Sequence, residues 1–568
     1  MVKRILKLFN KDFGNVHHAA ILLGVAMFTS QILGLIRDRI LASTIGPSQT
    51  LDIYYAAFRI PDLLFVTIAS LASVTAVAPM LARYFKDGDG EVEKLKAGKF
   101  LGDCLSFFSL ILVISCCVVF FLMPYLAHLI APGFDSAAQA ELVQVSRIML
   151  ASPLLLGISN LLGSVTQLFR RFVVYALSPI LYNLGIIIGV TFFYPTEGIV
   201  GLAYGVIIGA VLHVAIQIPT LVSLKMLPII HRDFSFAEVL SVIKTSLPRT
   251  MTLSLTTIAM FAIVSIASML GEGSISRLQF AYNLSAVPVA IIGLSYSVAA
   301  FPSLAHLFQE GKFDIFGSTV ANIFRHIIFW STPVLVLFVV LRAQIVRVIL
   351  GGGAFTWDDT KLTAAALALF VLSVVVNGLF ILMTRVFYAA GETRKPLIVA
   401  SSATVFQISL AYIFTKLYIF SEPARLFLER LFRVEGVPDT GMLMLALTFS
   451  VGSFISFFFL FHIVARRYLT RDLVRAIRTT AFDILFASLL GGLVAYGALH
   501  YFAFAFDLEH LKGVFFQGFL SGVLGIIVMF YTLKLLKNVE LEEVSSAIHK
   551  KFWKQEVLVA NEHETKEI

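Results

Sequence analysis

About fourteen apolar stretches, each long enough to cross a lipid bilayer as a helix of ~20 residues, follow one another along this chain. The backbone N–H and C=O groups of a membrane span must be paired inside the span, which a helix achieves by itself. The sequence therefore predicts an all-α polytopic membrane protein. The predicted spans are 19–36, 53–84, 101–130, 142–169, 172–193, 200–224, 243–270, 276–301, 327–340, 362–387, 396–420, 442–464, 484–500 and 514–533.

Composition excludes a soluble protein of this size. Hydrophobic residues make up 58% of the chain and charged residues 14%, and the mean hydropathy is +0.89. A soluble domain has about 45–50% apolar and about 25% charged residues. The net charge of +9 comes from basic residues scattered between apolar stretches, which is typical of membrane loops and not of nucleic-acid binding. Cys104, Cys116 and Cys117 share one apolar stretch, so we expect no disulfide framework, metal or cofactor.

Basic residues alternate between the loops. They precede the first stretch and follow every even-numbered one, as in Arg170-Arg171 after the fourth and Arg394-Lys395 after the tenth, whereas 132–140 and 194–198 contain no Lys or Arg. Loops rich in Lys and Arg stay on the cytoplasmic side. We therefore expect a multi-pass protein of the cell (inner) membrane with both termini in the cytoplasm. The stretch 424–434 breaks the alternation and reads as a short amphipathic helix on the outer surface.

An internal repeat indicates two lobes. Pro79–Phe85, at the end of the second stretch, and Pro302–Phe308, at the end of the eighth, share the pattern Pro-x-Leu-Ala-x-x-Phe. Elements six helices apart have the same orientation, which favours parallel lobes related by an axis along the membrane normal. We predict an N-terminal six-helix lobe (1–232), a second six-helix lobe (233–466), two additional spans (467–537) and a cytoplasmic tail (538–568).

Polar residues form stripes on the first two predicted helices. Gln31, Arg37 and Asp38 lie on one face of the first, and Asp52, Arg59 and Asp62 lie on one face of the second. Charged groups within a membrane usually face a cavity or a partner, and the arginine fork suits phosphate. Two alternatives are residues that snorkel to the outer headgroups and a purely structural ion-pair network.

The second lobe offers two further candidates, Arg277 and Asn283, near the start of the eighth stretch. Arg277 fits an interfacial anchor as well as a cavity group. Enzyme motifs such as a Gly-x-x-x-x-Gly-Lys loop or His-Glu-x-x-His are absent from the sequence, which argues against a membrane enzyme.

Several segments together resemble the MurJ (MviN) family of lipid II flippases, from the superfamily that includes MATE exporters and O-antigen flippases. The matching segments are Ser30–Asp38, Asp52, Ala57–Leu64, Phe280–Leu284, Val287-Pro288, Phe301–Leu304 and Arg385–Pro396. The resemblance implies a V-shaped two-lobed transporter that binds the pyrophosphate and sugar headgroup in a cationic central cavity and alternates between inward- and outward-open forms. Of its cavity residues, Arg37, Asp38, Asp52 and the basic Arg59 carry over.

The chain departs from the family pattern at three cavity positions. Gln31, Val66 and Asn283 stand where the family usually has arginine. As a whole, the resemblance implies a monomeric flippase for lipid II, with a lipid-linked glycan, membrane lipid and the cell-wall synthesis machinery as partners. The alternatives are a flippase for another lipid-linked oligosaccharide (O-antigen or teichoic-acid type) and, less favoured, a MATE-like antiporter. An arginine stands near each of the clearest carboxylates, Asp38, Asp52 and Asp62. A MATE-like antiporter would instead need a carboxylate that is available for cation coupling.

Overall fold

The computed structural model describes residues 16–72, 74–85, 90–231 and 234–553. Helices and their connecting turns make up these residues, and the single β-bridge within them joins Gly352 to Phe355. Eleven described helical segments are long and apolar enough to cross a membrane, or thirteen if each of two bent pairs is one span. The prediction of an all-helical polytopic membrane protein is confirmed.

The straight spans of the second half and the C-terminal region match the predicted stretches. The ends of the helices differ from the predicted ends by between a few residues and about a dozen. They are α13 (Phe236–Ala267), α16 (Phe313–Val340), α20 (Arg394–Phe420), α22 (Met442–Tyr468), α23 (Arg471–Phe502) and α24 (Leu511–Leu535). The structure extends several of them into the basic loops, because a helix continues through polar residues beyond the apolar stretch. Short helices flank them: α17 (Arg342–Leu350), α21 (Glu422–Phe432) and α25 (Val539–Trp553). The short helix expected at 424–434 is therefore present as α21.

In the first half, α6 (Glu91–Ile130) is one long helix, and the later spans are each built from two or three helical segments. They are α7 (Ser136–Met149) with α8 (Ala151–Leu168), α9 (Phe172–Ile188) with the π-helix η2 (Gly189–Phe193) and α10 (Tyr194–Glu197), and α11 (Ile199–Ala215) with α12 (Ile218–Leu224). The N-terminal helix α2 (Val16–Thr44) has 29 residues, or about 43 Å at ~1.5 Å per residue, and carries three consecutive charges, Arg37–Arg39. With α2, the helices correspond to the fourteen predicted stretches.

The second predicted stretch is not one continuous helix, which corrects the sequence-based expectation. It divides into α3 (Gln49–Ala57), α4 (Arg59–Thr67), the 3₁₀-helix η1 (Ala69–Ala72) and α5 (Val74–Arg83). Pro61 lies near the start of α4, where the missing N–H of proline is tolerated. The apolar run continues across the break, so hydropathy alone does not reveal it.

Two more predicted spans are interrupted. The eighth consists of α14 (Ser274–Pro288), the π-helix η3 (Val289–Leu294) and α15 (Ser295–Gln309). Pro288 cannot donate a backbone hydrogen bond and its ring crowds the preceding turn, which favours a local change of helical register. The tenth bends by 42° between α18 (Trp357–Val371) and α19 (Val374–Ala389). Interrupted spans within a bundle are a feature of transporters.

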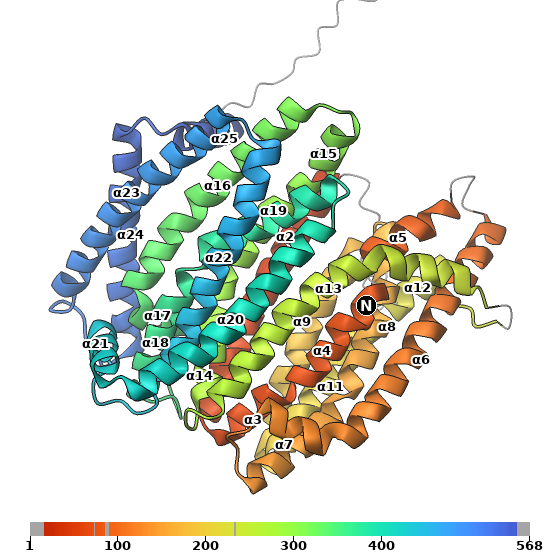
Figure 1. Ribbon diagram of the computed structural model, residues 1–568, viewed down its shortest axis with the longest axis horizontal. Coiled ribbons are helices and arrows are strands. Elements are labelled where there is room, and N and C mark those ends of the chain that lie inside the picture. The colour runs from red at the N-terminus through yellow and green to blue at the C-terminus, as the bar shows by residue number, and fades with distance from the viewer. Residues whose placement is uncertain (1–15, 73, 86–89, 232–233, 554–568) are drawn as a thin grey trace, which may run out of the picture.

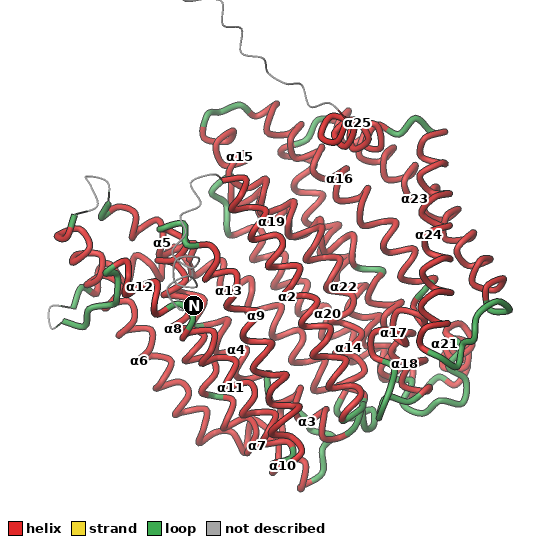
Figure 2. Tube along the Cα trace, turned by 180° about the vertical axis from the view of Figure 1, so that it is seen from behind, coloured by secondary structure: helices red, strands yellow, loops and turns green. Residues whose placement is uncertain are grey.

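The helices gather in two groups (Figure 1). Those from α3 to α12 lie at one end of the long axis, those from α14 to α24 lie at the other, and α23 and α24 pack against each other at the far edge. Helix α13 contacts α4 and α6 on one side and α20 on the other, while α2 contacts α9 as well as α14 and α17. Figure 2 shows the same arrangement from behind. The exact lobe boundaries predicted above stay a prediction.

Large apolar side chains cover the outside of the bundle, among them Phe121, Phe459 and Leu493, which are 74%, 65% and 67% exposed. In water, such an apolar surface would promote aggregation, whereas in a membrane it is solvated by lipid chains.

Candidate functional site

The centre of the candidate site is an ion pair on α2. The Nε and Nη2 atoms of Arg37 donate to the Oδ1 atom of Asp38 at 3.0 and 2.8 Å, and Arg37 Nη1 donates to Asn183 Oδ1 of α9 at 3.0 Å. The Asp38 side chain is only 3% exposed, whereas that of Arg37 is 22% exposed. The carboxylate is therefore buried behind an arginine that still reaches an open surface.

Hydrogen bonds extend this ion pair to α14 and α4. Asn283 Nδ2 donates to Asp38 Oδ2 at 2.8 Å, and Gln279 Nε2 donates to Asn283 Oδ1 at 2.8 Å. Arg59 Nη2 of α4 then donates to Gln279 Oε1 at 2.7 Å. We call this set the polar chain; its members are Asn183, Arg37, Asp38, Asn283, Gln279 and Arg59. It joins four helices and crosses the predicted boundary between the two lobes.

The polar chain contains two guanidinium groups and one carboxylate, and Arg59 is buried at 8% exposure. The Asp62 carboxylate, one turn further along α4, interacts electrostatically with Arg59. Within the described residues, no hydrogen-bond acceptor reaches the Arg59 Nε atom. A buried donor without a partner costs about 1–3 kcal/mol.

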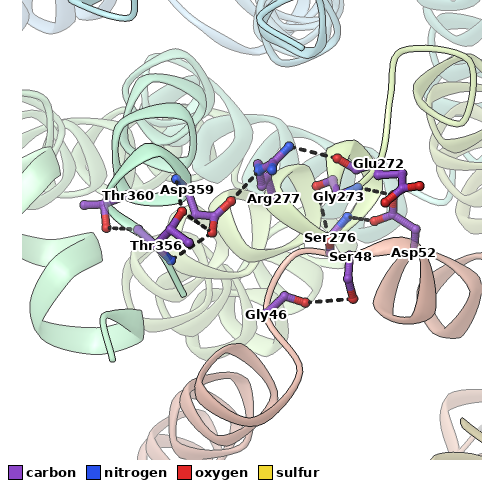
Figure 3. A network of polar contacts seen from close by, with 10 residues as sticks. All are labelled: Gly46, Ser48, Asp52, Glu272, Gly273, Ser276, Arg277, Thr356, Asp359 and Thr360. Carbon is purple, nitrogen blue, oxygen red and sulfur yellow. Dashed lines mark hydrogen bonds and ion pairs between the residues drawn. The ribbon is translucent and has the colours of Figure 1, made fainter. Parts of the chain in front are cut away.

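Asp52 lies apart from the polar chain and holds the beginning of α14 (Figure 3). Its Oδ2 and Oδ1 atoms accept hydrogen bonds from the backbone N–H groups of Gly273 (2.8 Å) and Ser276 (2.7 Å). A carboxylate is stabilised at a helix N-terminus by the unpaired N–H groups and the helix dipole. Asp52 of α3 thus caps a helix of the other half of the protein.

Arg277 lies beside this cap and pairs with α18 (Figure 3). Its Nε atom donates to Asp359 Oδ1 at 2.8 Å, and its Nη1 atom donates to the Glu272 carbonyl at 3.0 Å. Asp359 also accepts from Thr356 within the capping box that starts α18. These contacts place Arg277 in a network at the ends of α14 and α18.

Two predicted residues lie outside both networks. Gln31 is half-buried on α2, nearly two turns before Arg37, and Asp62 is exposed on α4, one turn after Arg59. The structure therefore joins Arg37, Asp38, Arg59 and Asn283 in one chain, places Asp52 and Arg277 together at the start of α14, and leaves Gln31 and Asp62 outside.

Three polar partners were not among the predicted site residues: Asn183, Gln279 and Asp359. Gln279 is one turn from Asn283 on α14 and could have been found from that spacing. Asn183 is an isolated amide within the apolar stretch 172–193, a weaker signal. Asp359 gave no signal, because it stands 82 residues after its partner Arg277.

The described residues contain no cluster of three or more His, Cys, Asp or Glu side chains that could hold a metal ion. Arginine forks and amides such as those of the polar chain can recognise an anion.

The architecture is that of a multi-pass membrane transporter. The solved structure of a lipid II flippase MurJ in an inward closed conformation matches with a TM-score of 0.71 at 22% identity, covering 94% of this chain and all of that one. A multidrug resistance MATE family transporter in an inward-facing conformation matches with a TM-score of 0.60 at 16% identity, over 79% of this chain and 98% of that one. At these identities, the likeness concerns the fold.

Sequence comparison identifies the family. The family model described as lipid II flippase MurJ matches residues 41–516, which is most of the chain. A probable lipid II flippase MurJ of Buchnera aphidicola subsp. Acyrthosiphon pisum is 26% identical over 89% of this chain and 96% of its own length. The lipid II flippase MurJ of Burkholderia cenocepacia is 27% identical over 70% of this chain and 78% of its own. The chain belongs to the lipid II flippase MurJ family, a family of membrane transporters and not of enzymes.

This membership confirms the resemblance noted in the sequence. The matched residues include Asp52, Arg59, Asp62, Arg277 and Asn283, while Gln31, Arg37 and Asp38 lie just before them.

Proposed function

We propose that this chain translocates lipid II, a polyprenyl-pyrophosphate-linked peptidoglycan precursor, from the inner to the outer leaflet of the cell membrane by alternating access. The observation that carries the proposal is Arg37, a partly exposed guanidinium held by Asp38 and Asn183 between the two groups of helices. Family membership supplies the substrate class, and a planar guanidinium fork suits the pyrophosphate.

Arg37 and Arg59 are the proposed pyrophosphate-binding groups. Arg59 has an unpaired Nε donor in the described structure, and Arg37 has an accessible surface. In this proposal, Asp38, Asn283 and Gln279 hold the two arginines in the absence of substrate, and the phosphate oxygens take over some of those hydrogen bonds. Gln31 and Asp62 line the approach to the same site.

Asp52 and Arg277 have a different proposed role. Asp52 connects α3 to α14, and Arg277 connects α14 to α18, so both hold helix ends on the side of the membrane away from the basic loops. In the proposed cycle, opening toward the outer side breaks the contact of Asp52 with α14.

The proposed topology follows the charge of the loops. The C-terminal ends of α5, α12 and α15 lie at one end of the bundle (Figure 1), where Arg83 ends α5 and Lys225 follows α12. The positive-inside rule assigns that end to the cytoplasm. Both termini are then cytoplasmic, the lobes are 1–232 and 233–466, and 467–537 adds two spans. We propose a monomer that works beside the cell-wall synthesis machinery.

Complementation of a strain depleted of its lipid II flippase tests the function. The unmodified chain should restore growth, and Arg37→Ala should fail to do so at equal membrane abundance. As a matched control, Arg347→Ala removes an arginine on α17 that stacks on Trp357 and should still complement. Normal growth with Arg37→Ala would refute the binding role of Arg37.

A second candidate is a flippase for another lipid-linked oligosaccharide. It is favoured by Gln31, Val66 and Asn283, which stand where the family pattern expects arginine. Native mass spectrometry of the purified full-length chain with lipid II and with an undecaprenyl-pyrophosphate-linked O-antigen saccharide separates the candidates. Preference for the saccharide would replace lipid II as the substrate.

A further inference from the structure

Two arginines lie close together where α17, α21 and α23 meet, at the end of the bundle away from the basic loops (Figure 1). Arg342 is the first residue of α17, and Arg433 directly follows α21. The Nη2 atom of Arg433 donates to the Tyr496 hydroxyl of α23 at 3.4 Å. We call Arg342, Arg433 and Tyr496 the arginine site. It shares no residue with the polar chain.

Close packing of α16 against α23 brings Arg342 to the level of Tyr496. A Cβ atom added at Gly492 of α23 would meet Val336 Cγ1 and would lie 3.7 Å from Val340 Cγ2, both on α16. Tyr496 is one turn beyond Gly492, and Arg342 is two residues beyond Val340. The two side chains therefore come together just beyond the end of the membrane span α16.

The half-buried Arg342 faces another cation. Burial and then the like charge of Arg433 lower the pKa of the Arg342 guanidinium below its usual value, while Tyr496 acts in the opposite direction. The Nη1 atom of Arg342 donates to the Val339 carbonyl at 3.0 Å. Within the part of the chain that the structure describes, neither arginine pairs with a carboxylate. An anion bound between them would relieve this repulsion.

The other two arginines of α21 already have carboxylate partners. Arg425 Nε lies 3.9 Å from Glu429 Oε1, and Arg430 Nε lies 3.3 Å from Glu435 Oε1. The arginine site differs from them because its two guanidinium groups share only a neutral hydroxyl. Two planar forks and a hydroxyl offer donors that suit the oxygens of a phosphate.

Apolar side chains on α23 indicate that the ligand is a lipid. Leu493 and Leu489 precede Tyr496 by about one and two turns on the same face of the helix, and they are 67% and 55% exposed. They lie on the side of Tyr496 that faces into the membrane, and tyrosine rings are enriched at the level of the headgroups. A lipid whose phosphate meets the arginines would lay its chains along these leucines, which a soluble phosphate would not contact.

We propose that the arginine site binds the phosphodiester headgroup of an anionic phospholipid. Arg342, Arg433 and Tyr496 contact the phosphate, and Leu489 and Leu493 contact the acyl chains. In the topology proposed above, this lipid belongs to the outer leaflet. The bound lipid joins α17, α21 and α23 at a place where the chain itself supplies no negative charge.

Lipid binding to the purified full-length chain tests the proposal. Native mass spectrometry should show tighter binding of phosphatidylglycerol than of phosphatidylcholine, which has no net charge. Arg342→Gln/Arg433→Gln should weaken phosphatidylglycerol binding on the order of tenfold, because each basic residue near the membrane surface contributes to the attraction. Arg433→Gln alone changes an exposed side chain, so it should fold normally and should still weaken binding.

The matched control is Arg425→Gln/Arg430→Gln. It removes the same charge from the same end of the bundle, but from arginines that pair with glutamates, and it should bind phosphatidylglycerol as the unmodified chain does.

Four outcomes would overturn the proposal. They are equal binding of the two lipids, equal losses in both double variants, unchanged binding by Arg433→Gln, and displacement of phosphatidylglycerol by soluble glycerol phosphate, which would assign the site to a free phosphate compound. The measurement detects lipid binding and not translocation, so its result is independent of the flippase proposal.

Discussion

The amide of Asn283 on α14 donates to the carboxylate of Asp38 on α2 at 2.8 Å, and this bond joins α14 to the N-terminal helix at the middle of the polar chain. A neutral amide therefore links α14 to this carboxylate. It satisfies the second oxygen of a carboxylate whose first oxygen belongs to Arg37.

Asn283→Ala should destabilise the structure described here. It leaves one oxygen of buried Asp38 and the amide of Gln279 without their partner, at a cost of about 1–3 kcal/mol. Thermal unfolding of the purified protein should show a lower midpoint. Asn377→Ala is a suitable control, because within the described residues its amide donates to Ser373, one turn away on the same span. An equal loss there would contradict a special role for Asn283.

Arg37→Lys should impair transport while leaving the protein abundant in the membrane. Lysine keeps the charge but cannot contact Asp38 through two nitrogens and reach Asn183 with a third. Complementation should weaken strongly, by tenfold or more if about 1.4 kcal/mol of binding is lost. Growth equal to that of the unmodified chain would show that charge alone suffices.

Asp52→Asn should loosen the junction between α3 and α14. One of the two carboxylate oxygens becomes an NH₂ group that faces a backbone N–H, and the charge that stabilises the N-terminus of α14 is lost. Cysteines introduced at the start of α14 should become more accessible to a membrane-impermeant thiol reagent applied from outside.

Asp358→Asn is the control for this change. Asp358 is an exposed residue that pairs with Lys361 at 2.9 Å, and its loss should leave labelling unchanged. Labelling that does not differ between the Asp52 and Asp358 variants would contradict the proposed closure.

Gly205→Leu should prevent correct packing of the first half. A Cβ atom at Gly205 would lie 2.6 Å from the Gly189 Cα atom, so α11 approaches η2 through backbone contact. Helices in membranes use such small residues for close approach. We expect little folded protein in size-exclusion chromatography.

Gly497→Leu provides the contrast on α23, where an added Cβ would meet nothing within 4 Å. This variant should behave as the unmodified protein does. Normal folding of Gly205→Leu would show that α11 can shift away without loss.

Hydropathy alone determined that the chain is a bundle of membrane helices, because a span of apolar residues has no other stable conformation in a bilayer. The spacing of polar residues likewise placed Arg37 and Asp38 on one helix face. It also predicted a shared face for Asp52 and Arg59, whereas the structure places them in α3 and α4 and in separate hydrogen-bond networks. Local periodicity decides these features, so they can be read from a single sequence. It did not reveal the breaks in the second and eighth spans, where the residues remain apolar while the backbone hydrogen-bond register changes.

Only the tertiary structure decided which polar groups meet. The partners of the polar chain are 146, 220 and 245 residues apart for Arg37–Asn183, Arg59–Gln279 and Asp38–Asn283. Hydropathy and helical spacing constrain each span by itself, whereas contacts between spans depend on how the helices pack, and a single sequence does not encode that in any local pattern.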